Sequence, residues 1–244
     1  MSATAPIKIF VIGCGRSGTH WVGGALASHP HIVTQIEAQP AFGLAVEMAW
    51  DPAIERTQMP ELLRVYEETH AQIRPRHFAD KSHPVLWLAE ALADHFPEAH
   101  FVAIRRRVLP TVASMLNHAS VRRHFERWNA NPAPNRFLGV TDVAAYAALP
   151  DEARCALRAI TSSREIDRLA GQSRCRIHVI EYEEMQADPG VAAREMATFL
   201  GVPNLFLPPM ARPKSLEKWR TQLSPSQIEV VTAFTEGLGA SERL

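Results

Sequence analysis

The stretch FVIGCGRSGTHW, Phe10 to Trp21, is the feature that most constrains the fold. An apolar run leads directly into three glycines, Gly13, Gly15 and Gly18, and helix-forming residues follow. A strand that ends in glycines and opens into a helix presents backbone N–H groups and the positive end of the helix dipole to an anion. The sequence therefore predicts a phosphate-type anion site at the end of the first strand.

Two interpretations of this loop lead to different enzymes. The Gly-x-Gly-x-x-Gly spacing fits a dinucleotide fingerprint, and Glu37 follows about 20 residues later, where an acid would hold a ribose hydroxyl. That interpretation predicts a nicotinamide- or flavin-dependent oxidoreductase. Alternatively, Gly13 to Gly18 followed by Thr19 is a phosphate-binding loop without its usual lysine.

The side chains after the loop favour a single, highly charged group. Arg16, Ser17, Thr19 and His20 supply a cation and two hydroxyls aimed at one phosphate, more than a dinucleotide loop needs. A magnesium-dependent nucleotide kinase is disfavoured, because the Gly-Lys-Ser/Thr ending is absent and the run FVAI leads to arginine instead of aspartate. Glu181, which ends the run HVIE, leaves that exclusion incomplete.

Short apolar runs alternate with longer helical patterns along the chain. We expect strands at Lys8–Gly13, Ile32–Ile36, near Phe78, His100–Ile104 and Arg176–Glu181. We expect helices at Gly18–Ser28, Glu61–His70, Pro84–His95, Pro110–His118, Val191–Leu200 and Pro225–Leu238. This alternation predicts a three-layer α/β fold, with a central, mostly parallel sheet and helices on both faces. We expect one domain over residues 1–244, with an excursion from the sheet at about 117–150 that is a candidate lid over the substrate.

The charge balance limits the possible partners. The 26 basic and 26 acidic side chains give a formal net charge of zero, so no overall field attracts nucleic acid or an anionic membrane. The apolar start of the chain is too short to span a bilayer, and no membrane span is expected. Three cysteines, an odd number without close pairing, argue against a disulfide framework and a zinc site and favour a cytoplasmic protein.

A second informative block runs from His77 to Leu116. Lys81-Ser-His83-Pro precedes a helix, and a buried strand then runs directly into Arg105 and Arg106. Arginines at the carboxyl end of a parallel strand point into the crevice where open α/β sheets bind ligands. Ser114, in the following helix, is expected beside the same anion.

Four segments together carry a resemblance: GCGRSGTHW, DKSHP, FVAIRRRVLPTVAS and IEYEEMQADPGVAAREMATFLGVP. In this order they resemble the sulfotransferases that use 3'-phosphoadenosine 5'-phosphosulfate (PAPS), with the P-loop-like fold of that family. The resemblance runs from about Lys8 to Leu223, with a weak gap from Asn117 to Arg174. Arg16 stands where cytosolic members have lysine, as in the tyrosylprotein and many bacterial or carbohydrate members.

The resemblance assigns most of the candidate site. It implies that Gly15, Arg16, Ser17, Gly18, Thr19 and His20 cradle the 5'-phosphosulfate. Arg106, eight residues before Ser114, would hold the 3'-phosphate with that serine. This chain has Arg-Arg-Val-Leu instead of the family's Arg-Asp-Pro-Arg, so Arg105 stays an alternative. Lys218 resembles a cofactor-binding lysine near the carboxyl terminus, and Tyr182 is a candidate for the adenine side.

Two residues are candidates for the catalytic base. Glu37 has the spacing of the catalytic glutamate in the tyrosylprotein branch, and His83 resembles the histidine of the Lys-Thr-His segment in cytosolic members. Lys81 would place positive charge near the bridging oxygen of the leaving phosphate. Fixed cations matter most in such a transfer, and no metal is required.

The main hypothesis is thus in-line transfer of a sulfuryl group from PAPS to an acceptor hydroxyl or amine. The other product is adenosine 3',5'-bisphosphate (PAP). The alternatives are the oxidoreductase and a non-catalytic nucleotide-binding module. The acceptor, whether small molecule, carbohydrate or peptide, and the oligomeric state are open.

Overall fold

The computed structural model describes residues 5–207 and 209–244. Its strands are β1 (Lys8–Gly13), β2 (Ile32–Ile36), β3 (His77–Lys81), β4 (His100–Arg105) and β5 (Arg176–Glu181). Its helices are α1 (Thr19–Ala27), α2 (Ala41–Trp50), α3 (Glu55–Ile73), α4 (Ala89–His95), α5 (Val108–Leu116), α6 (Ala119–Ala130), α7 (Val143–Ala147), α8 (Asp151–Ala170), α9 (Tyr182–Ala187), α10 (Pro189–Leu200), α11 (Lys214–Glu217), α12 (Trp219–Gln222) and α13 (Pro225–Gly237). Three 3-10 turns complete it, at η1 (Pro52–Ile54), η2 (His83–Leu88) and η3 (Ser241–Arg243).

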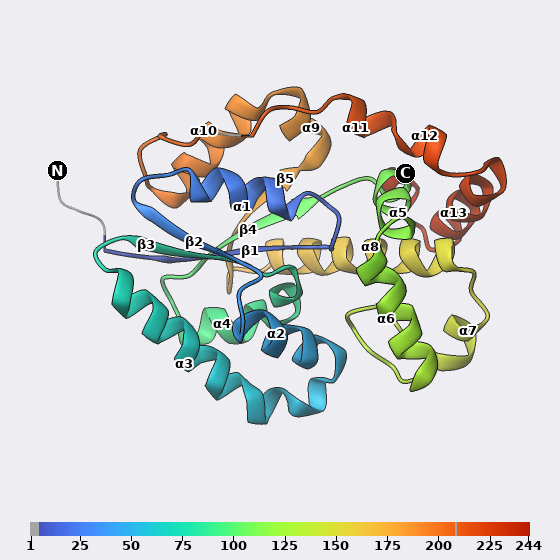
Figure 1. Ribbon diagram of the computed structural model, residues 1–244, viewed down its shortest axis with the longest axis horizontal. Helices are drawn as coiled ribbons and strands as arrows, with labels where there is room; N and C mark the ends of the chain where they lie inside the picture. Colours follow the sequence, from blue (N-terminus) through green and yellow to red (C-terminus); the bar gives the residue numbers. More distant parts are fainter. Residues whose placement is uncertain (1–4, 208) are drawn as a thin grey trace.

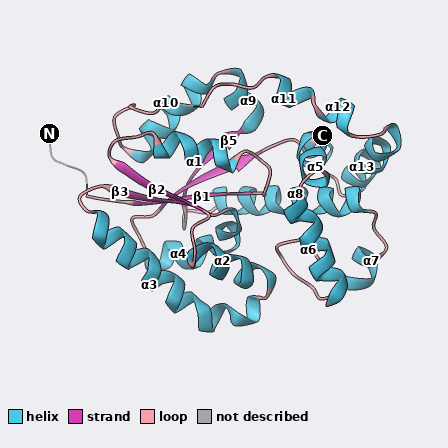
Figure 2. Cartoon of the chain, viewed as in Figure 1, coloured by secondary structure: helices cyan, strands magenta, loops and turns pink. Residues whose placement is uncertain are grey.

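The five strands form one parallel sheet in the order β2-β3-β1-β4-β5. Side chains of a strand point alternately to the two faces of its sheet. Ile9 and Val11 accordingly pack with α1, α9 and α10, while Phe10 and Ile12 pack with α3, α4 and α8. Figure 1 shows α1, α9 and α10 above the sheet and α3 and α4 below it, and Figure 2 shows the strands enclosed between the helices. The predicted three-layer α/β class is confirmed.

The expected strands agree with the structure to within a residue or two. The expected helices correspond to α1, α3, η2 with α4, α5, α10 and α13, although α3 begins earlier, at Glu55. Pro110 is the third residue of α5 instead of the first, which is tolerated because N–H groups of the first turn lack partners within the helix. The expectation did not include α2, α6 or α8.

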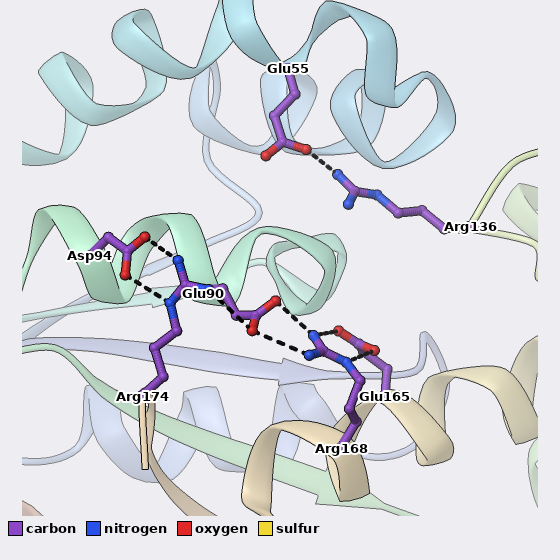
Figure 3. Close-up of polar contacts among 7 residues, drawn as sticks. All are labelled: Glu55, Glu90, Asp94, Arg136, Glu165, Arg168 and Arg174. Carbon is purple, nitrogen blue, oxygen red and sulfur yellow. Dashed lines mark hydrogen bonds and ion pairs between the residues drawn. The ribbon is translucent and has the colours of Figure 1, made fainter. Parts of the chain in front are cut away.

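Helix α8 is the most consequential of these, because it packs under the sheet and also against α5 and α13. A network of ion pairs links α8 to α4 (Figure 3). Arg168 pairs with Glu90 at 2.8 Å and with Glu165 on its own helix, and Arg174 also reaches Glu90. Exposed pairs contribute only about 0–1 kcal/mol each. Shared partners nevertheless fix the position of α8, and with it the side chains at the other end of that helix.

None of the helices in the described residues combines the length and the apolar character needed to span a bilayer. The three cysteines, Cys14, Cys155 and Cys175, are buried free thiols.

Candidate functional site

The carboxyl ends of the parallel strands bring the predicted residues to one edge of the sheet. Ile36 of β2 aligns with Lys81 of β3, and Gly13 of β1 aligns with Ile104 of β4. The N–H of Glu37 donates to the carbonyl of Lys81 at 3.0 Å, which extends the pairing by one residue. The glycine loop, Glu37, Lys81 and the arginines after β4 therefore lie around one crevice.

Two hydrogen bonds from Ser17 close the turn of the glycine loop. Both the N–H and the hydroxyl of Ser17 donate to the carbonyl of Cys14, at 3.1 and 2.7 Å. Ser17 is buried and does not line the cavities around the loop, so its side chain shapes the turn instead of facing an anion.

The first turn of α1 is open to an anion. No side chain in the described residues caps this nine-residue helix. Its N-cap, Gly18, has a φ of 108°, and a Cβ placed there would lie 2.5 Å from Cδ2 of Tyr182. Only glycine fits this approach. Thr19 and His20 begin the helix and line the adjoining cavity, so the loop leaves N–H groups of the first turn facing a hollow, an arrangement that favours anions.

Arg16 lies at the centre of the crevice. Its φ of 75° is in the left-handed region, which costs a residue with a side chain about 1–3 kcal/mol and is typical of functional sites. Its Nε donates to Oγ of Ser114 at 3.2 Å. Three adjoining cavities, of about 480, 270 and 300 Å³, all have Arg16 in their lining.

Arg106 is held in the 270 Å³ cavity with its guanidinium partly unsatisfied. It donates to the carbonyls of Arg16 and Ser215, each at 3.2 Å, and lies 4.2 Å from the ring centroid of Tyr182. Its Nε is buried and has no hydrogen-bond partner within the described residues. Burial lowers the pKa of Arg106, although an arginine stays charged in proteins. Ser114, Tyr182 and Lys218 line the same cavity.

Arg105 forms ion pairs with acidic residues away from the glycine loop. Its guanidinium pairs with Asp167 of α8 and Glu181 at the end of β5. Arg105 thus joins two structural elements, while Arg106 faces the glycine loop. Of the two arginines left open by the sequence, Arg106 is the one beside Ser114 and Arg16.

Glu37, Lys81 and His83 form a cluster in the 480 Å³ cavity. Lys81 is fully buried and its Nζ pairs with Oε1 of Glu37. His83 Nδ1 lies 3.3 Å from the same oxygen, while its Nε2 lies 3.5 Å from Nη2 of Arg158. Because Arg158 can only donate, the imidazole carries its proton on Nδ1 and donates it to Glu37. The backbone of Glu37 has a φ of 50°, a second strained residue at this edge.

The charges within this cluster are set by burial and pairing. Burial acts to raise the pKa of Glu37, but hydrogen bonds from His83 and Lys81, with their charges, outweigh it and lower the pKa to about 2. Burial lowers the pKa of His83 to about 4, with Glu37 acting in the opposite direction. Burial also lowers the pKa of Lys81. At neutral pH the cluster therefore contains a carboxylate, an ammonium and a neutral imidazole.

The neighbours of this cluster include two features that the sequence interpretation missed. A Cβ on Gly23 of α1 would lie 3.0 Å from Cγ of Lys81, so that glycine makes room for the lysine stem. Arg158 of α8 lines the cavity and approaches Gly15 as well as His83. The pattern of α8, with Pro150 and two acids at its start, was the signal that could have found it.

The strand order separates the two interpretations of the glycine loop. In a dinucleotide-binding sheet with the order 3-2-1-4-5-6, the acid-bearing second strand lies next to the first. Here β3 lies between β1 and β2, so Glu37 is two strands away from the glycine-bearing strand. The fingerprint therefore lacks its structural context, and the oxidoreductase alternative has no support.

Comparison with known proteins agrees with this geometry. A family model described as "Sulfotransferase family" matches residues 6–206. No curated protein sequence matches the chain significantly. Three solved structures share the fold over nearly their whole length. A sulfotransferase from Alicyclobacillus acidocaldarius is 18% identical with a TM-score of 0.61, and 98% of this chain and 95% of that one are covered.

The other two are sulfotransferase domains of larger systems. The domain from the Synechococcus PCC 7002 olefin synthase is 16% identical with a TM-score of 0.58, covering 96% of this chain and 97% of that one. The domain from the curacin biosynthetic pathway is 15% identical with a TM-score of 0.59, covering 96% and 98%. The fold is thus the P-loop-like sulfotransferase fold. With a family match over most of its length, the chain belongs to the sulfotransferase family and is a transferase that moves sulfuryl groups.

Proposed function

We propose that this enzyme transfers a sulfuryl group in line from PAPS to an acceptor hydroxyl or amine. The observation that carries the proposal is the position of Arg16, which lines three adjoining cavities. On one side lie Arg106 and Ser114, which suit a phosphate, and on the other lie Glu37 and Lys81, which suit a proton transfer. A donor with two anionic ends and a separate acceptor fit this division.

The residues around Arg16 fit the two charged ends of the donor. The N–H groups of the first turn of α1, with Arg16, Thr19 and His20, would hold the 5'-phosphosulfate. Arg106, whose buried Nε lacks a partner, would hold the 3'-phosphate with Ser114, and Lys218 lines the same cavity. Tyr182, stacked on Arg106, would border the adenine. These assignments place one anion at each of the two smaller cavities.

When bound, PAPS supplies the sulfuryl group: the acceptor oxygen or nitrogen forms a new bond to sulfur, the bond from sulfur to the phosphate oxygen breaks, and PAP leaves. We assign Glu37 as the base, because its carboxylate lines the open cavity from which an acceptor can approach. The proton of the acceptor would pass to a carboxylate oxygen of Glu37. The lone pair of His83 faces Arg158, so we assign His83 to positioning Glu37.

Lys81 would place its ammonium against negative charge that develops on the leaving oxygen. A fixed cation in a buried site is worth more than in water, because little solvent screens it. The excursion at 117–150 supplies Ser120, Val121, His124 and Phe137 to the wall of the 480 Å³ cavity. We therefore propose that it faces the acceptor, within a single domain over residues 1–244.

Calorimetric titration with adenosine 3',5'-bisphosphate tests the donor site. We expect saturable binding that 5'-AMP and NAD do not reproduce, because only the bisphosphate carries the 3'-phosphate. Arg106→Ala should weaken binding about 10- to 100-fold, the loss expected for hydrogen bonds to a charged group.

Arg105→Ala is the matched control. It removes the neighbouring arginine, which pairs with Asp167 and Glu181 instead of facing the loop, so the preference for the 3'-phosphate should survive. Equal binding of bisphosphate and 5'-AMP by the wild-type protein would overturn the assignment of PAPS.

A further inference from the structure

Arg158 is a buried cation that pairs with no carboxylate among the residues the structure describes. Its residue is 3% exposed, and its guanidinium lies 4.1 Å from the ring centroid of Phe137. Its Nη2 lies 3.5 Å from Nε2 of His83. Within residues 5–207 and 209–244, no carboxylate forms an ion pair with it. Other arginines close to the same elements, such as Arg136 and Arg168, do pair with acids.

An unpaired buried charge is costly, and its cost is offset when an anion is bound beside it. Arg158 lines the 480 Å³ cavity, so an anion that enters this cavity can reach it. Burial lowers the pKa of Arg158, which reflects the same cost of holding its charge away from water. The position of the arginine thus suggests a ligand as its missing partner.

The charged residues that line the 480 Å³ cavity also favour an anionic ligand. Among its lining residues are the cations Arg16, Lys81, Arg123 and Arg158, while the only carboxylate among them is Glu37, which already pairs with Lys81. A cavity lined by one sign of charge concentrates ligands of the opposite sign. Part of this excess positive charge, on Arg16 and Lys81, suits the donor. Arg158, however, lies on the far side of His83 from Lys81.

Part of the remaining wall is apolar. Phe42 and Val46 come from α2, and Val121 and Phe137 come from the excursion. Cavities of this kind bind ligands through apolar surface and use a few polar groups to fix orientation. A ligand that satisfies the lining has an apolar body and one anionic group.

Resting on the proposed function, we propose that the acceptor is an amphipathic hydroxy acid. Its carboxylate pairs with Arg158, its apolar body lies against Phe137 and α2, and its hydroxyl meets Glu37. Glu37 and Arg158 contact opposite nitrogens of His83. The hydroxyl and the carboxylate of the acceptor would therefore lie at two separate points of the same cavity.

Matched pairs of compounds test this proposal. The probes are 4-hydroxyphenylacetate and 3-hydroxydecanoate, each with its neutral amide, assayed for sulfuryl transfer from PAPS. The wild-type enzyme should use at least one acid with a kcat/KM about 10- to 100-fold above that of its amide, the range expected for one charge-assisted contact. Arg158→Met should abolish that preference, and Arg158→Lys should keep part of it.

Controls separate folding from recognition. Arg122→Met removes an exposed arginine of α6 that does not line the cavity, and it should keep the preference for the acid. Each variant is also titrated with adenosine 3',5'-bisphosphate, because unchanged binding shows an intact fold. If Arg158→Met fails to fold, Arg158→Lys carries the comparison.

Several outcomes overturn the proposal. Equal use of acid and amide by the wild-type enzyme would do so, as would failure to use any of the four compounds. A loss in Arg158→Met that is equal for acid and amide would assign the guanidinium to the transferred sulfuryl group instead. The titration keeps the two proposals apart: if the wild-type protein binds the bisphosphate but shows no preference for acids, only the acceptor proposal fails.

Discussion

The carboxylate of Glu37 contacts both Lys81 and His83, and from these contacts we infer that Glu37 is the base. We predict that Glu37→Gln lowers kcat about 100- to 10,000-fold, the usual contribution of a general base. Binding of adenosine 3',5'-bisphosphate should be unchanged, because Glu37 lines the 480 Å³ cavity and not the two smaller ones. Steady-state kinetics and calorimetry measure the two effects.

The comparison with His83 gives this prediction its control. His83→Asn retains a donor that can reach Glu37, so it should recover most of the activity that His83→Ala loses. Such a rescue is expected of a positioning residue and not of a base. If Glu37→Gln stays active while every substitution at His83 is inactive, the roles are reversed.

Helix α1 contains a pair of neighbouring glycines with different surroundings. A Cβ at Gly23 would lie 3.0 Å from Cγ of Lys81, whereas one at Gly24 would make an ordinary contact with Pro209 at 3.5 Å. Replacing glycine by alanine within a helix stabilises it by up to about 1 kcal/mol. We predict that Gly24→Ala raises the thermal midpoint and keeps kcat, while Gly23→Ala displaces Lys81 and lowers kcat.

Thermal unfolding and kinetics of both variants check this prediction. Because the two substitutions add the same methyl group to the same helix, a loss of kcat in Gly23→Ala alone traces to Lys81. Equal kinetics for the two variants would show that the lysine stem adapts and that α1 does not set its position.

The helices, strands and their contacts also show how much of the site could be predicted from the sequence. Glycines, buried apolar runs and residues at strand ends are local signals, and they predicted the five strands and the crevice at their carboxyl ends. Whether Arg105 or Arg106 faces that crevice depends on Asp167 of α8, 62 residues further along the chain. Gly23 likewise looks like an ordinary helix glycine until β3 brings Lys81 against it. Contacts of this kind arise only when distant elements pack, so the sequence left them open.

Across the whole molecule, buried histidines make the free energy of unfolding depend on pH. Burial lowers the pKa of His70 and His83 to about 4 and that of His124 to about 3, against an ordinary value of about 6.5. Between pH 6.5 and 4 the unfolded chain therefore binds protons that the folded chain does not, so acidification favours unfolding. Burial raises the pKa of Asp80 to about 6, which acts in the opposite direction but through one group.

We therefore predict a lower urea midpoint at pH 5.0 than at pH 7.5. His70→Leu should reduce this dependence, because it removes one of the titrating groups at a buried position outside the described cavities. Equilibrium unfolding of both proteins at the two pH values makes the measurement. A midpoint that does not change with pH would contradict the inferred neutral state of these histidines.

In the proposed arrangement, part of the wall that would meet the acceptor and the groups that would hold the donor's phosphates come from different stretches of chain. Val121, Phe137 and Arg158 belong to the stretch from α6 to α8, whereas the glycine loop lies at the junction of β1 and α1, and Arg106 and Ser114 come before α6. Selection can therefore alter one stretch without rebuilding the other. In this architecture, substitutions between α6 and α8 would change one part of the acceptor wall while the glycine loop and its chemistry stay the same.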